Sequence, residues 1–204
     1  MLERVVDVEL FHVARTALTY NERPAMTVGS IIEAGPAHNS FFGSFERPVA
    51  FSVPINGKQQ MVPAVELLFR IQKGEFATAA LPKMAWDTAN HFKNLSRELL
   101  MEIVRMKEAA DAPSRMKSLW TTDTLGQALE WSKILGGPAT IFSLRATGKV
   151  FRTDAALLMK DSEPYSVSLH RASEYWAGKA RDQKEPEILF EGIAIVDAIE
   201  VQVP

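Results

Sequence analysis

The stretch Ser118–Gly137, "SLWTTDTLGQALEWSKILGG", predicts a short strand that leads directly into a helix. Thr124 suits the N-cap position of this helix, and Gln127 three residues later completes a capping box. Gly136 and Gly137 end the helix, because glycine readily adopts the left-handed conformation found at helix C-termini. Three apolar residues face inward at helical spacing, namely Leu125, Leu129 and Ile134. Local folding therefore explains the second part of the stretch.

Trp120, Thr121 and Thr122 are not explained by these helix signals. They lie just ahead of a helix N-terminus, where free amide groups and the helix dipole favour an anion or another ligand. An aromatic side chain and two hydroxyls at such a junction are either ordinary packing or one wall of a nucleotide site. Only the rest of the sequence can distinguish the two interpretations.

The composition is that of a globular chain without a dominant charge. Of the 204 residues, 47% are hydrophobic and 24% charged, which suits one domain over 1–204 with loop and helical additions in 16–110. The net charge of −2 argues against a bulk basic field for nonspecific nucleic-acid binding. The absence of cysteine excludes disulfides, thiol catalysis and cysteine-ligated metal. Because no signal peptide and no apolar run of about 18 residues is found, we expect a cytoplasmic protein that makes no membrane contact.

The first half of the chain predicts a strand, an irregular stretch and two helices. The alternating residues Val5–Arg15 suit a strand, whereas residues 16–58 are rich in Gly, Pro, Asn and Phe and suit small irregular elements or a lid. One helix begins at Pro63 and closes at Gly74. A long amphipathic helix spans 85–109. Its predicted apolar stripe consists of Phe92, Leu95, Leu99, Leu100, Ile103 and Val104.

The second half is richer in short strands. The segments "ATIFSLRA" and "KVFRTD" predict two strands that are separated by a turn at Thr147 and Gly148. A helix, "SLHRASEYWAGK", ends at Gly178, and two closing strands follow as "EILFEG" and "IAIVDAIEVQV". Helices toward the first half and strands clustered in the second indicate an α+β fold.

Several familiar kinds of site are missing from the sequence. It has no glycine-rich phosphate loop of the Walker or dinucleotide type and no Gly-x-Ser-x-Gly nucleophile motif. The four histidines have no second ligand at zinc-type spacing, so we expect no metal. They are His12, His38, His91 and His170. The usual cofactor enzymes and the common hydrolase triad are therefore disfavoured.

The first predicted strand carries two polar candidates. His12 alternates with Phe11 and Val13, so it faces the opposite side from these apolar neighbours. It is either a half-buried structural histidine or a residue of a site. Arg15, at the end of the same strand, is either a solvated strand end or a second candidate.

A late strand carries three carboxylates. Glu187 opens the strand "EILF", Glu191 closes it, and Glu185 precedes it on the loop. A carboxylate at the start of an apolar strand either faces solvent or is held at a cleft. Glu191 lies four residues from Glu187, and residues four apart on a strand share a face. Both Glu191 and Glu185 are therefore alternatives to Glu187.

Taken together and in this order, these motifs resemble the ADP-ribosyltransferase superfamily of toxins and poly-ADP-ribose polymerases. That fold has a His or Arg on its first strand, an aromatic-Ser/Thr strand that runs into a helix, and a Glu that opens a late strand. "FHVAR", "PSRMKSLWTTD" and "EILFEG" are also similar to motifs of an uncharacterised bacterial and phage family. The resemblance spans Leu10–Val203 and implies a split β-sheet core with an inserted long helix.

The resemblance also implies roles for individual residues, with NAD as co-substrate and no metal. Glu187 would accept a hydrogen bond from the 2′-hydroxyl of the nicotinamide ribose and stabilise the cation that forms there. His12 would bind the ribose on the adenosine side. Either Trp120 or Trp131 would stack on the nicotinamide. The hydroxyls of Thr121 and Thr122 would bind ribose or phosphate, and Arg15 or Arg115 the pyrophosphate.

One departure from the family pattern leaves the first-strand residue open. Trp120 stands where one class has Tyr, whereas the Thr-Thr that follows is similar to the Ser-Thr of the class with Arg on its first strand. Either His12 or Arg15 is therefore the NAD-binding residue of the first strand.

The implied activity is mono-ADP-ribosyl transfer to a protein or nucleic acid, as in a toxin, an effector or a protein of phage conflict. An antitoxin or regulatory partner would fit such a role. Two alternatives use the same fold: an NAD glycohydrolase with water as acceptor, and a binding module without catalysis.

Overall fold

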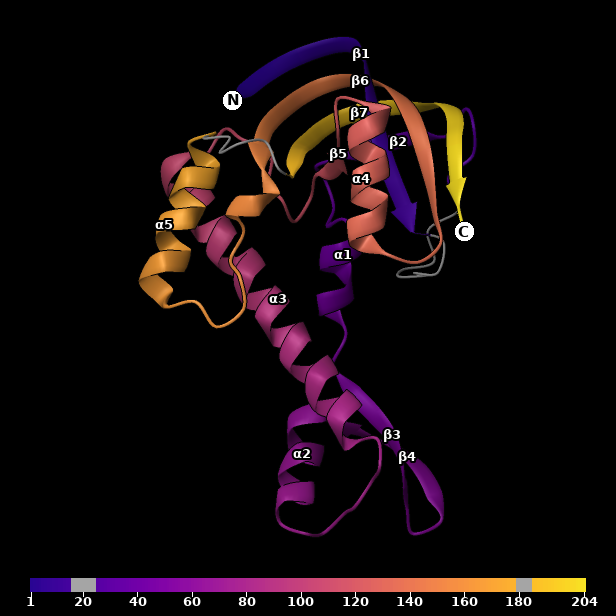
Figure 1. Ribbon diagram of the computed structural model, residues 1–204, viewed down its shortest axis with the longest axis vertical. Coiled ribbons are helices and arrows are strands. Elements are labelled where there is room, and N and C mark those ends of the chain that lie inside the picture. The colour runs from indigo at the N-terminus through magenta and orange to yellow at the C-terminus, as the bar shows by residue number, and fades with distance from the viewer. Residues whose placement is uncertain (16–24, 179–184) are drawn as a thin grey trace.

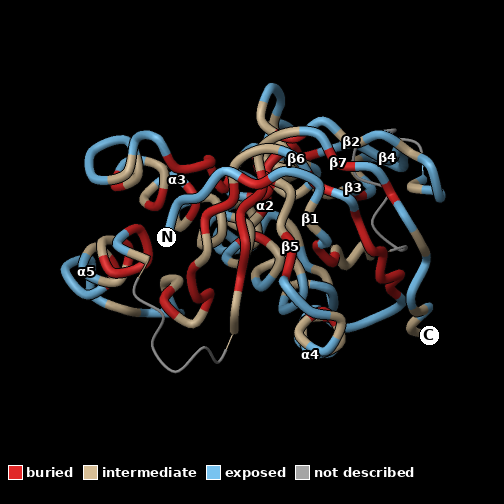
Figure 2. The backbone as a smooth tube through the Cα atoms, turned by 90° about the horizontal axis from the view of Figure 1, so that it is seen from above, coloured by how far each residue is buried: buried red, intermediate tan, exposed pale blue. Residues whose placement is uncertain are grey.

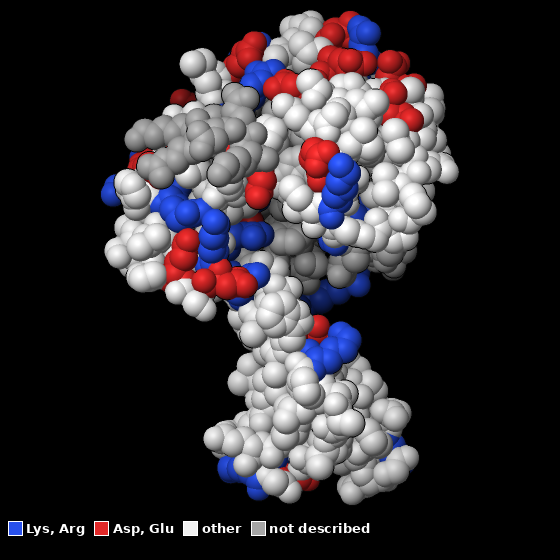
Figure 3. Space-filling view, in the orientation of Figure 1, with Lys and Arg blue, Asp and Glu red and all other residues white. Residues whose placement is uncertain are grey.

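The computed structural model describes residues 1–15, 25–178 and 185–204. A head contains most strands, and a narrower arm extends from it (Figure 1). The long helix α3 (Leu81–Glu108) runs from the head into the arm, which also contains a β-hairpin and the helix α2 (Ala64–Gln72). Figure 3 shows side chains of both charges over the head and fewer on the visible face of the arm.

Within the described residues, the head is built on a five-stranded antiparallel sheet with the order β1-β6-β7-β2. The short strand β5 lies off this path and pairs with the first residues of β7. The strands are β1 (Leu2–Arg15), β2 (Ile31–Ala34), β5 (Leu119–Thr121), β6 (Ala139–Asp154) and β7 (Pro186–Val203). Helices accompany this antiparallel sheet without βαβ repeats, so the predicted α+β class is confirmed.

The predicted division of the last strands was wrong. The two strands expected on either side of Thr147 and Gly148 form one strand, β6, and the two closing strands form one strand, β7. The reason is that Gly148 pairs with Gly192 across these strands. A Cβ on Gly148 would lie 2.2 Å from the Glu191 carbonyl oxygen and 2.8 Å from the Gly192 Cα. These glycines permit a close approach of two backbones and do not mark a turn.

Gly148→Ala is therefore expected to destabilise the protein by about 1–3 kcal/mol, because the methyl group has no space without a shift of the β7 backbone. Gly126→Ala is the matched control, since a Cβ at this helical position meets nothing closer than 3.9 Å. It should stabilise the protein by about 0.5–1 kcal/mol. Urea unfolding of both variants measures the difference, and equal stability of the two would contradict this account of Gly148.

The helix of the central stretch forms as predicted, but Ile134, which is predicted to face inward, is 56% exposed. Helix α4 (Leu125–Leu135) begins after Thr124, whose Oγ1 accepts a hydrogen bond from the Gln127 backbone N–H at 3.2 Å. The Gln127 side chain accepts in turn from the Asp123 N–H at 3.1 Å, so the predicted capping box is confirmed. Helix α5 (Tyr165–Trp176) follows β6 after a short 3-10 turn, η2 (Ala155–Leu157).

The irregular stretch predicted for 16–58 contains several short elements in its described part, which begins at residue 25. These are β2, α1 (Ser40–Gly43), the 3-10 turn η1 (Ser44–Glu46) and β3 (Ala50–Ile55). The Asn39 side chain caps α1 and donates to the carbonyls of Arg115 and Ser118, so α1 is tied to the segment before β5. Strand β3 pairs with β4 (Lys58–Pro63) in the arm, where α2 closes a small core on the hairpin.

The predicted apolar stripe of α3 is wrong at three of its six positions. Phe92, Leu99 and Ile103 are 45%, 44% and 64% exposed. The face that α3 turns inward carries Glu98, Met101 and Val104, packed toward α5 and the sheet. A carboxylate is buried here because Arg115, from a separate segment, donates to it. Among the described residues, no helix is both long and apolar enough to cross a membrane.

The core runs along the strands of the head (Figure 2). One cluster joins α3 and α5 to β6 and β7 through residues such as Met101, Tyr175 and Leu189. A second cluster packs α4 on β1 and β6 through Ala128, Phe11 and Ile141. The pairing of β5 with the first residues of β7 therefore lies where helices from both clusters meet the sheet.

Candidate functional site

The three strands that carry the sequence motifs are neighbours. Strand β5 pairs with β7 through Trp120 with Leu189 and Thr121 with Ile188. On its other side, a β-bridge between Thr122 and Phe11 joins it to β1. Motifs that are far apart in the sequence thus meet around the short strand β5.

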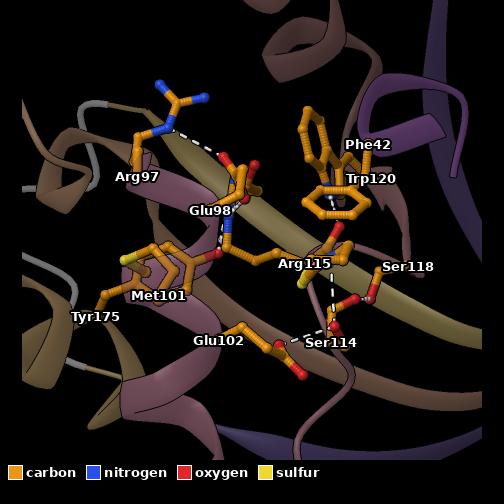
Figure 4. A network of polar contacts seen from close by, with 12 residues as sticks. Phe42, Arg97, Glu98, Met101, Glu102, Ser114, Arg115, Ser118, Trp120 and Tyr175 are labelled. Carbon is orange, nitrogen blue, oxygen red and sulfur yellow. Dashed lines mark hydrogen bonds and ion pairs between the residues drawn. The ribbon is translucent and has the colours of Figure 1, made fainter. Parts of the chain in front are cut away.

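Glu187 is buried, with 5% of its surface exposed, and it is held by two donors. The Arg115 guanidinium and the Tyr175 hydroxyl both donate to Oε2 of Glu187, the latter at 2.6 Å. Arg115 also donates through Nε to Glu98 at 3.0 Å, and Arg97 donates to the other oxygen of Glu98 at 3.0 Å. Figure 4 shows Arg115 reaching between Glu98 and Tyr175 from the segment before β5.

The protonation states of Arg115 and Tyr175 are set by burial and by the neighbouring carboxylates. Burial would lower the pKa of the Arg115 guanidinium, but the carboxylates of Glu187 and Glu98 outweigh burial and hold that pKa well above its ordinary value. Burial raises the pKa of the Tyr175 phenol well above its ordinary value, and the Glu187 carboxylate adds to this shift. Arg115 therefore stays charged, and Tyr175 stays a hydrogen-bond donor.

The two oxygens of Glu187 differ in their surroundings. Oε2 accepts from Arg115 and Tyr175, whereas Oε1 accepts no hydrogen bond within the part of the chain that the structure describes. Described residues thus fix Oε2 in place, whereas none of them donates to Oε1.

A pocket of about 360 Å³ lies beside the start of β7. Its wall includes Trp131 and Thr124 of the α4 segment, together with Glu185 and Pro186 directly before Glu187. The Trp131 indole N–H donates to the Pro186 carbonyl at 2.7 Å, which fixes the ring against this segment. The structure therefore brings two predicted residues, Trp131 and Glu185, to the chain segment that carries Glu187.

The Trp-Thr-Thr triplet has structural partners. The Trp120 indole donates to the Arg115 carbonyl at 3.1 Å, and its ring lies 4.8 Å from the Arg115 guanidinium and 5.1 Å from the Phe41 ring. Thr121 and Thr122 are 3% and 4% exposed, and their hydroxyls donate to backbone carbonyls. Packing therefore accounts for these three residues without a ligand.

The two arginines predicted for the pyrophosphate have different surroundings. Arg115 is 1% exposed, and its guanidinium is committed to Glu98, Glu187 and Tyr175. The prediction that Arg115 contacts a pyrophosphate is therefore corrected: its position suits the support of Glu187. Arg15 is half-buried, and within the described residues it donates one long hydrogen bond of 3.4 Å to the Leu135 carbonyl at the end of α4.

His12 contacts the backbone of β5. Its Nδ1 lies 2.8 Å from the Trp120 carbonyl oxygen. Burial lowers the pKa of His12, although the bond to this carbonyl opposes the shift, so the ring is neutral near pH 7 and Nδ1–H is the donor. Because Phe11 pairs with Thr122 and side chains alternate, His12 projects from the face opposite to Phe11. Thr121 pairs with Ile188, so extending the β5–β7 register by one residue places Glu187 opposite Thr122. Glu187 therefore lies on the same face of the sheet as Phe11 and Thr122, and His12 projects from the other face.

The lowered pKa of His12 makes stability depend on pH. Between this lowered value and the ordinary 6.5, the unfolded chain binds more protons than the folded protein, so the free energy of unfolding falls as pH falls. His12→Asn keeps an N–H donor without a titrating ring and should lose less stability between about pH 7 and pH 5. His170→Asn, whose parent side chain is 70% exposed, is the control and should behave like wild type. Urea unfolding at both pH values tests this, and parallel losses in His12→Asn and wild type would contradict it.

Glu191 lies apart from Glu187. It lines a larger cavity of about 710 Å³ and pairs with Lys149 at 3.3 Å. The cavity has mixed charges on its walls, including Arg4, Glu33, Arg105 and Lys117. Neither His12 nor Glu187 lines this cavity. Among the described residues, no group of three or more His, Asp or Glu side chains could hold a metal ion.

The sequence comparisons assign a family. Residues 10–201 match the sequence model of a family described as a protein of unknown function, DUF2441. The chain belongs to the DUF2441 family. The match includes β1 from Leu10, all of β5 and nearly all of β7, so these strands are part of the DUF2441 unit. No curated protein matches the chain.

Two members of the buried group in this DUF2441 protein were missed by the sequence analysis. Glu98 lies among the charged residues that flank the predicted stripe of α3, and nothing in the local pattern marks it as buried. Tyr175 sits in the predicted helix next to Trp176, and its complete burial follows from packing against α3 and β6. A buried carboxylate requires a buried cation, and that partner comes from the separate segment of Arg115.

Proposed function

We propose that this protein is an NAD-dependent mono-ADP-ribosyltransferase that transfers ADP-ribose to a protein or nucleic-acid acceptor. The observation that carries the proposal is the Glu187 carboxylate, with one oxygen fixed by Arg115 and Tyr175 and the other without a partner among the described residues. Glu187 is the second residue of β7 and follows Pro186, which lines a pocket together with Trp131.

The chemistry needs a carboxylate with this arrangement. In the reaction, the bond between the ribose C1′ and the nicotinamide nitrogen breaks, and its electron pair neutralises the pyridinium. The positive charge that develops on the ribose is stabilised by a nearby anion, and burial strengthens this attraction. Oε1 of Glu187 would accept a hydrogen bond from the ribose 2′-hydroxyl. The acceptor then forms the new bond to C1′ with its own electron pair and loses its proton to solvent.

The pocket of Trp131, Glu185 and Pro186 suits the nicotinamide end of the co-substrate, although Glu187 itself is not among its lining residues. Its volume of about 360 Å³ lies within the range of small-molecule sites. The Trp131 ring offers an aromatic face for stacking, and its bond to the Pro186 carbonyl keeps that face in one orientation. Trp131 is therefore the better candidate for stacking than Trp120, whose ring already contacts Arg115 and Phe41.

His12 has two proposed contributions. Its Nδ1–H holds the Trp120 carbonyl and so joins β1 to β5. The neutral ring leaves Nε2 as an acceptor for a ribose hydroxyl on the adenosine side, and Arg15 is the remaining candidate for the pyrophosphate. Because His12 projects from the face opposite to Glu187, the first contribution has more support than the second.

The experiment is incubation of the purified protein with NAD labelled on its adenylate part, in the presence of bacterial protein and nucleic acid. Nicotinamide release with label on a macromolecule is the expected result. Nicotinamide release with free ADP-ribose would instead identify a glycohydrolase. Binding of NAD without any release would indicate a binding module, and absence of both would refute the proposal.

A further inference from the structure

Glu98, Arg115, Tyr175 and Glu187 form one connected group of buried residues in the head. Glu98 and Arg115 are each 1% exposed and Tyr175 is fully buried. Glu98 comes from α3, Arg115 from the segment before β5, Tyr175 from α5 and Glu187 from β7, so four separate segments meet here. Burying this many polar groups is costly unless each is paired, and here each of them has a partner.

Two carboxylates share the Arg115 guanidinium. Its Nε donates to Glu98, whereas NH1 donates to Glu187 and Tyr175. A guanidinium that faces a single carboxylate often binds both of its oxygens through two parallel hydrogen bonds. Glu98 anchors the guanidinium at Nε, and among the described contacts NH1 reaches only Oε2 of Glu187. The Trp120 and Tyr175 rings, 4.8 and 5.3 Å from the guanidinium carbon, add to this restraint.

We propose that Glu98 is a positioning residue, which keeps Oε1 of Glu187 open to substrate by holding Arg115 away from it. The inference rests on the proposed function of Glu187. Arg97 supports Glu98 from the other side, since its Nε donates to the second oxygen of Glu98. Helix α3 extends from this point into the arm, so the inserted helix itself contributes to the state of the site carboxylate (Figures 1 and 4).

The test compares Glu98→Gln with Glu98→Asp in the full chain. Glutamine keeps the shape but not the charge, so Arg115 is expected to turn toward Glu187 and bind both of its oxygens. The kcat for nicotinamide release should then fall by up to about a hundredfold, because the catalytic group is misplaced. The KM for NAD should stay near the wild-type value, since Glu98 contacts no substrate. Aspartate keeps the charge on a shorter side chain and should restore part of kcat.

Glu102→Gln is the matched control. Glu102 lies one turn further along α3, where it pairs with Arg105 and accepts from the Ser114 hydroxyl but does not contact the Arg115 guanidinium; glutamine keeps an acceptor for Ser114. This variant should keep the wild-type kcat. Thermal unfolding shows whether each variant is folded. If Glu98→Gln does not fold, the kcat of Glu98→Asp still tests the role of Glu98.

The outcomes separate the two proposals. Wild-type protein that releases no nicotinamide would refute the proposed function and this inference with it. Active wild type with an unchanged kcat in the Glu98 variants, or with a change in KM alone, would overturn only the role of Glu98. A loss of kcat in Glu98→Gln, with partial recovery in Glu98→Asp, supports it.

Discussion

Replacing Arg115 with methionine is expected to lower the free energy of unfolding by about 3–5 kcal/mol. Methionine fills much of the same volume but supplies neither the charge nor the donors. The Glu98 and Glu187 carboxylates, 1% and 5% exposed, then lose the guanidinium between them. Arg97 still contacts Glu98 but does not reach Glu187 through any hydrogen bond or ion pair among the described residues.

Urea unfolding measures this loss. Arg145→Met is the control, because Arg145 forms an exposed ion pair with Asp7, and such pairs contribute little. The free energy of unfolding of this control should be nearly that of wild type. A loss in Arg115→Met no larger than in Arg145→Met would contradict the structural importance of the buried group.

The loss of unfolding free energy in Arg115→Met should also depend on pH. Burial would raise the pKa of Glu98, but Arg115 and Arg97 outweigh burial and hold that pKa below its ordinary value of 4.5. A lowered carboxylate pKa contributes stability above pH 4.5, and this contribution is lost as the pH falls through the folded pKa. The difference between wild type and Arg115→Met should therefore be largest near neutral pH and narrow below pH 4.5.

Local signals in the sequence were sufficient for some elements and misleading for others. The capping box of Thr124 and Gln127 involves neighbours in the chain, so α4 was predicted correctly. Gly148 was interpreted as a turn residue, whereas its role is to let β6 and β7 approach at Gly192. That requirement arises from a residue more than forty positions away, and no local pattern reveals it.

The same limit applies to the candidate site. Apolar residues of α3, such as Ile103, were expected inside, yet the helix turns Glu98 inward because Arg115 neutralises it there. The order of the motifs predicted that His12, Trp120 and Glu187 belong to one region, and β5 does adjoin both β1 and β7. Which of these side chains face each other depends on strand register, and the sequence does not contain that information.

Glu187→Gln is expected to reduce nicotinamide release by about 100- to 1,000-fold, the usual cost of removing one oriented group that stabilises transition-state charge. The amide oxygen can accept from Arg115 and Tyr175 in place of Oε2. The amide NH₂ then stands where Oε1 was and presents a donor to the ribose 2′-hydroxyl instead of an acceptor. The variant should remain folded, because Arg115 keeps its ion pair with Glu98.

Glutamine variants of other carboxylates test whether the loss of nicotinamide release is specific to Glu187. Glu200→Gln changes an exposed residue of the same strand and should release nicotinamide at the wild-type rate. Glu191→Gln and Glu185→Gln test the two alternatives, and we expect smaller losses because Glu191 lies in the other cavity and Glu185 on the wall of the Trp131 pocket. A wild-type rate in Glu187→Gln, together with a large loss in either of these variants, would move the catalytic role to that residue. Because Glu187 is the carboxylate that Arg115 and Tyr175 hold in place, the largest loss is expected at Glu187.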